Sequence, residues 1–99
     1  MRNVNLSNIY LHLIQFYGAN KFEIYSTVNQ YRVPTETIIE FHLNHDIRAN
    51  LKRINRVLEK EIKLVKNFYV VQEDLKIIIC IQYYTVKGMI EYDFEHSAN

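Results

Sequence analysis

The residues of this chain best suited to chemistry are the lysines and arginines of its middle third. Residues 47–66 contain seven of the twelve Lys and Arg residues but only two of the eleven acidic ones, a local net charge of +5, while the rest of the chain sums to −4. A basic stripe on a helix is the usual electrostatic footprint of a protein that binds a polyanion. The segment therefore predicts contact with phosphate groups rather than a covalent reaction.

Helical spacing places three of these basic residues on one side of the predicted helix. Arg48, Lys52 and Arg56 recur every four residues with no acidic residue between them, and like charges at this spacing slightly destabilise an isolated helix. A partner that neutralises them would remove this repulsion. We predict that the nucleic-acid contacts come from the following side chains: Arg48, Lys52, Arg53, Arg56, Lys60 and Lys63. Two other interpretations stay open, namely that the stripe contacts a protein, or that it is solvated charge without a function.

A second group of side chains has the types that ligate metal ions. On a strand, Glu40 and His42 would share a face, and His45 and Asp46 would follow at the start of the next helix. No third spaced His or Cys completes a ligand set, so we predict no metal and no other cofactor. A metal site would have to use His42, His45 and Asp46. The competing interpretation is a polar loop in which Asn44 or Asp46 caps the helix and the histidines are solvated.

Covalent catalysis finds little support in the residue pattern. Gly18 and Gly88 lie far apart, so no glycine-rich phosphate loop can form. The lone Cys80 stands in an isoleucine run, where a thiol is most often a small buried hydrophobe with a raised pKa. We therefore expect a protein that is not an enzyme.

Two amphipathic helices must position these groups. Apolar residues recur at spacings of three and four from 5 to 17, and Gly18 follows where a left-handed cap belongs. The same period over 47–66 predicts the basic helix. Leu11 and Phe16 fall outside the apolar stripe of the first helix, which predicts a cover from a second subunit and hence a homodimer.

Residues 21–44 allow two interpretations. As strands, they are rich in β-branched and aromatic residues, with a type I turn at 33–36 that has Pro34 in its second position. The second strand would then turn Thr37, Ile39, Phe41 and Leu43 inward. As helices, they imitate a helix-turn-helix. We favour strands because helix formers such as Ala and Leu are absent between 21 and 37.

The C-terminal third predicts a three-stranded meander. The strands are expected at 68–72, 75–86 and 89–95, with the middle strand central in the sheet because both of its faces are apolar. The last strand alternates apolar residues with Glu91, Asp93 and Glu95, a pattern typical of a half-exposed edge. Residues 96–99 are predicted to form a frayed tail.

These elements predict one α+β domain over 1–99, with two helices packed on an antiparallel sheet; the alternative is a winged helix-turn-helix. The predicted function is a small non-enzymatic nucleic-acid-binding or regulatory protein, with DNA and RNA both open. The alternative is a protein–protein interaction module that inhibits a host protein, such as a nucleic-acid enzyme, through Glu91, Asp93 and Glu95. A lone Cys without a leader or long apolar run predicts a cytoplasmic location and no membrane partner. The residue preferences suggest a phage or mobile-element source.

Overall fold

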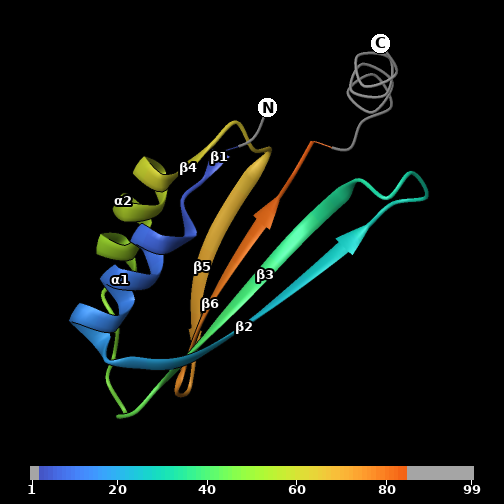
Figure 1. Ribbon diagram of the computed structural model, residues 1–99. Coiled ribbons are helices and arrows are strands. Elements are labelled where there is room, and N and C mark those ends of the chain that lie inside the picture. The colour runs from blue at the N-terminus through green and yellow to red at the C-terminus, as the bar shows by residue number, and fades with distance from the viewer. Residues whose placement is uncertain (1–2, 85–99) are drawn as a thin grey trace.

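The computed structural model describes residues 3–84, which form two helices and a four-stranded antiparallel sheet with a small two-stranded pair beside it (Figure 1). In chain order the elements are β1 (Asn3–Val4), α1 (Leu6–Tyr17), β2 (Ala19–Val28), β3 (Pro34–Leu43), α2 (Leu51–Glu61), β4 (Ile62–Lys63), β5 (Asn67–Glu73) and β6 (Lys76–Gln82). The prediction of an α+β fold with two helices packed on an antiparallel sheet is confirmed.

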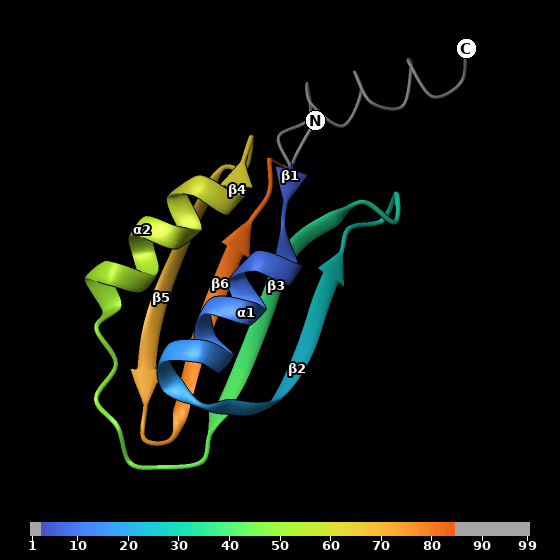
Figure 2. The same cartoon turned by 60° about the vertical axis from the view of Figure 1, so that its left-hand side comes forward.

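Both helices lie on one face of the sheet, as the two views show together (Figures 1 and 2). The strand order is β2-β3-β6-β5, so β6 lies between β3 and β5 as its two apolar faces predicted. We call the sheet face that α1 and α2 leave uncovered the open face. The core forms on the opposite side, where Ile77, Ile79 and Ile81 of β6 are 0% exposed against the helices. Neither helix described is long or apolar enough to cross a membrane.

Residues 19–43 form a β-hairpin, so the winged helix-turn-helix alternative is wrong. In β3 the predicted inward residues Thr37, Ile39, Phe41 and Leu43 are all buried. The predicted turn at 33–36 is wrong, because the chain reverses at 29–33 and Pro34 begins β3. The Asn29 side chain decides this, since its Oδ1 accepts hydrogen bonds from the backbone N–H groups of Tyr31 (2.8 Å) and Val33 (3.1 Å).

Helix α1 ends as its sequence predicted. Gly18 adopts a left-handed conformation (φ 63°) and its N–H donates to the Ile14 carbonyl at 3.1 Å. Glycine suits this position because it has no Cβ to clash in the left-handed region. The helix buries Ile9, Leu13 and Tyr17 against the sheet.

Helix α2 is shorter than its predicted range of 47–66, and its cap is neither Asn44 nor Asp46. Asn50 caps it, with its side chain accepting from the Arg53 N–H at 3.1 Å. Residues 44–50 instead run as an irregular lead-in, because Gln72 of β5 bonds their backbone. The helix ends at Glu61 because Ile62 pairs with Val4 in the small sheet of β1 and β4. The third meander strand and the tail at 96–99 lie outside the described residues.

Candidate nucleic-acid interface

An open groove of about 510 Å³ separates α2 from the edge strand β5. Helix α2 contributes basic residues to it, and β5 contributes aromatic ones. The lining residues are Leu51, Lys52, Asn55, Arg56, Glu59, Phe68, Tyr69 and Val70. The short connection at 62–66 turns β5 back along α2, and this places the start of the strand beside the basic side of the helix.

The two groove cations have no carboxylate partner among residues 3–84. Lys52 and Arg56 are exposed, and the ion pairs within this range lie elsewhere, on the open face. The one acidic residue of the groove, Glu59, accepts a hydrogen bond from the Asn55 side-chain amide at 3.1 Å. The groove therefore presents positive charge that other groups of the described chain leave unneutralised.

The structure separates the other predicted basic residues from this pair. Arg53 points toward α1, where its guanidinium lies 4.1 Å from the centre of the Phe16 ring. Lys63 belongs to β4 and its Nζ donates to the Glu59 carbonyl at 2.6 Å. Lys60 is exposed but does not line the groove, and Arg48 lies on the lead-in before the helix. The predicted stripe is thus divided, with Lys52 and Arg56 as its groove-facing part.

The aromatic residues beside the groove were missed from the sequence. Phe68 faces the groove and is partly buried. Tyr69 is 46% exposed at the rim, and its side chain turns to the open face, where it lies opposite Cys80. Both residues were assigned only to a strand. The sequence feature that could have predicted them is the short link between the basic helix and the strand, because it requires the strand to return beside the helix. Aromatic faces next to unpaired cations can hold nucleobases and phosphates together.

No family model, curated protein or solved structure matches the chain. The one cysteine, Cys80, is buried in the sheet, and burial raises the pKa of its thiol, which makes it a poor nucleophile at neutral pH. The groove is suited to binding a ligand through charge and stacking.

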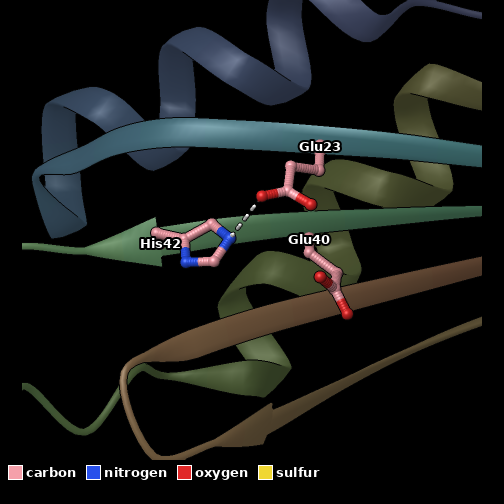
Figure 3. Close-up of side chains that lie close together, drawn as sticks. All are labelled: Glu23, Glu40 and His42. Carbon is pink, nitrogen blue, oxygen red and sulfur yellow. Dashed lines mark ion pairs between the residues drawn. The ribbon is translucent and has the colours of Figure 1, made fainter.

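The structure also separates the residues that were predicted as metal ligands. His42 lies on the open face with Glu23 and Glu40, and the ligand atoms of these three side chains lie within 4.8 Å of one another (Figure 3). His45 and Asp46 are exposed in the lead-in and join no such group in the described part of the chain. Glu23 was missed because only the pairing of β2 with β3 places it opposite Glu40.

Hydrogen bonds set the charge state of Glu23. The Tyr25 hydroxyl and then the Lys21 ammonium donate to its carboxylate and hold its pKa below the usual value. The same bond to Glu23 raises the pKa of Tyr25 to about 12. Glu23 is therefore ionised at neutral pH.

Proposed function

We propose that this chain is a small non-enzymatic nucleic-acid-binding or regulatory protein that holds its ligand in the groove between α2 and β5. One observation carries the proposal: Lys52 and Arg56, without an ion pair to any described residue, share a groove with Phe68, and the exposed ring of Tyr69 lies just across the edge of β5. Cations beside exposed aromatic rings can neutralise phosphates and stack bases at the same site.

The exposed aromatic ring at this edge favours single strands over duplexes. An unpaired base exposes its π face, whereas a duplex hides it in the stack. Tyr69, on the open face beside the groove, can therefore contribute only to an unpaired ligand that passes over the edge of β5. Stacking of this kind is tolerant of sequence because every base has a π face. The protein is therefore expected to bind single-stranded nucleic acid with modest sequence preference, in the cytoplasm of a bacterium or of a cell that carries its mobile element.

A mobility-shift assay at several salt concentrations tests the proposal. Binding should weaken as salt rises from about 50 to 200 mM, with a log–log slope of about −0.7 per neutralised phosphate on single strands and −0.9 on duplex. The double variant K52E/R56E should lose binding. The matched control is K60E/K66E, which makes the same charge change at exposed positions that do not line the groove.

Two results would remove the proposal. One is the absence of any shift at low salt with both single strands and duplexes. The other is an equal loss of affinity in K52E/R56E and K60E/K66E, since that would show an effect of net charge without a defined site. The single variant R48E then shows whether the contact surface extends onto the lead-in.

The aromatic part of the site has its own test. Tyr69→Ala should weaken single-strand binding by about 1–3 kcal/mol per stacked base and leave duplex binding nearly unchanged. Tyr31→Ala is the matched control, because Tyr31 is similarly exposed in the turn between β2 and β3. Equal affinities for Tyr69→Ala and Tyr31→Ala would show that stacking at Tyr69 contributes nothing.

A second candidate function, protein association, is favoured by a different surface. An apolar groove of about 480 Å³ runs between α1 and β2, and Leu11 beside it is 60% exposed. Strand β2 is an edge of the four-stranded sheet, and antiparallel pairing of two such edges is naturally two-fold symmetric. A second copy of the chain is therefore the occupant that we propose, in line with the predicted homodimer.

Light scattering after size-exclusion chromatography tests this association. The wild-type chain should elute as a dimer and Leu11→Glu as a monomer, while Gln15→Glu, on an exposed position of the same helix, should remain a dimer. A monomeric wild-type chain would contradict the proposal. The host-protein surface predicted at Glu91, Asp93 and Glu95 lies outside the described residues, and pull-down with nuclease treatment remains its test.

A further inference from the structure

The open face of the sheet carries a cluster of ligand-type side chains that the groove does not use. Glu23 of β2 lies directly opposite Glu40 of β3 in the antiparallel register, and His42 follows Glu40 by two residues on the same face. Figure 3 shows the two carboxylates and the imidazole gathered above these neighbouring strands. Their ligand atoms all lie within 4.8 Å of one another.

Two features of this cluster suit a cation. Glu23 and Glu40 lie directly opposite each other in an antiparallel pair, where like charges repel, and the lysines near them are exposed. The Nε2 atom of His42 is buried and has no hydrogen-bond partner, and its ion-pair distance to Glu23 Oε1 is 3.7 Å. Buried polar atoms without a partner are rare, and one explanation is an ion that belongs at the site.

We propose that Glu23, Glu40 and His42 bind a divalent cation of the zinc class. One imidazole nitrogen and two carboxylate oxygens are ligands that Zn²⁺ accepts in proteins, with water completing a four-coordinate shell. Bonds of about 2.0–2.2 Å require the ligand atoms to approach one another by roughly 1 Å from their present separations. Rotation of the two glutamate side chains can supply this movement, because both are only partly buried.

Two lysines compete with the proposed ion. Lys21 Nζ lies 3.4 Å from Glu23 Oε1, and Lys76 Nζ lies 4.0 Å from Glu40 Oε2. The side chains of these lysines are 67% and 45% exposed, so they can withdraw into solvent at little cost. A cation that binds the carboxylates must displace them, and their removal is therefore expected to strengthen metal binding.

The site is independent of the proposed nucleic-acid function. It lies over β2 and β3 on the open face, whereas the groove lies between α2 and β5 at the other edge of the sheet. Loss of metal binding should therefore leave nucleic-acid binding unchanged, and the reverse, so an experiment can contradict one proposal without affecting the other.

Titration of the full chain with Co²⁺, followed by visible absorption and by competition with Zn²⁺, tests the proposal. The expected result is one ion per chain with the intense visible absorption of four-coordinate Co²⁺. His42→Ala and Glu40→Gln should each weaken binding at least tenfold, and circular dichroism should show that both variants fold. His45→Ala and Asp46→Asn are the matched controls, because these neighbouring groups are exposed in the lead-in and should bind as the wild type does.

Removal of the two lysines gives a test in which metal affinity is expected to rise. The variant K21A/K76A should bind the ion more tightly, because it removes the competing ammonium groups without touching a ligand. Three results would overturn the proposal: no binding by the wild type at millimolar Co²⁺ or Zn²⁺, unchanged affinity in His42→Ala, or the same loss in His45→Ala as in His42→Ala. Weaker binding by K21A/K76A would equally contradict it.

Discussion

The guanidinium of Arg53 lies over the ring of Phe16, 4.1 Å from its centre, and so joins α2 to α1. Cation–π contacts of this kind contribute about 0.5–1 kcal/mol at exposed sites. Arg53→Gln should therefore lower the free energy of unfolding by about that amount, as measured by urea denaturation. Arg56→Gln is the control on the groove side of the same helix, and it should leave stability unchanged. Equal effects in the two variants would show that the ring contact is not stabilising.

The pH dependence of stability should reflect His12, which packs beside the rings of Phe16 and Tyr17. Burial, and then the charge of Arg53, lowers the pKa of His12 from 6.5. The unfolded chain therefore takes up this proton first, so stability is present above pH 6.5 and declines as the pH falls below it toward the lowered folded-state value.

His12→Gln should flatten this part of the stability profile between pH 7 and 5, as followed by urea denaturation. Arg53→Gln should raise the His12 pKa in an NMR titration, because it removes the neighbouring positive charge. A His12 resonance that titrates at or above 6.5 in the wild type would contradict the lowered value.

The start of α2 depends on the side chain of Asn50, which accepts from the Arg53 N–H at 3.1 Å. Asn50→Ala should lower the free energy of unfolding by about 1 kcal/mol, the usual effect of losing a helix N-cap. Asp46→Ala should change it by less than about 0.5 kcal/mol, since Asp46 is exposed and is not the cap. Chemical denaturation of the two variants decides between the caps, and a larger loss in Asp46→Ala would favour the one predicted from the sequence.

The lead-in before α2 is held by Gln72. Its Oε1 accepts from the Ala49 N–H at 2.8 Å, and its Nε2 donates to the Ile47 carbonyl at 2.6 Å. Gln72→Leu should lower the free energy of unfolding by about 1–3 kcal/mol, because it leaves partly buried backbone groups without a hydrogen-bond partner. Amide exchange at Ala49 should accelerate, and any contribution of Arg48 to nucleic-acid binding should fall. Gln15→Leu is the control at an exposed position, and unchanged exchange at Ala49 would contradict the role of Gln72.

Local patterns predicted the elements well where one face of each element is buried. The alternation in β3 and the helical stripe through Ile9 and Leu13 both correspond to buried residues in the structure. The predictions of the turn and of the start of α2 were wrong because hydrogen bonds from individual side chains determine both positions. Asn29 closes the turn through its side-chain oxygen Oδ1, and Gln72 holds residues 44–50 from a strand more than twenty positions away.

By itself, the sequence determined the class of the fold, the left-handed cap at Gly18, the central place of β6 and the concentration of positive charge near α2. These features follow from periodicity, residue preference and composition, which act over a few neighbouring residues. Only the tertiary structure divided that charge, turning Arg53 toward Phe16 and leaving Lys52 and Arg56 beside β5. It also brought Glu23 opposite Glu40, because the register of β2 and β3 depends on which residues form the turn between them.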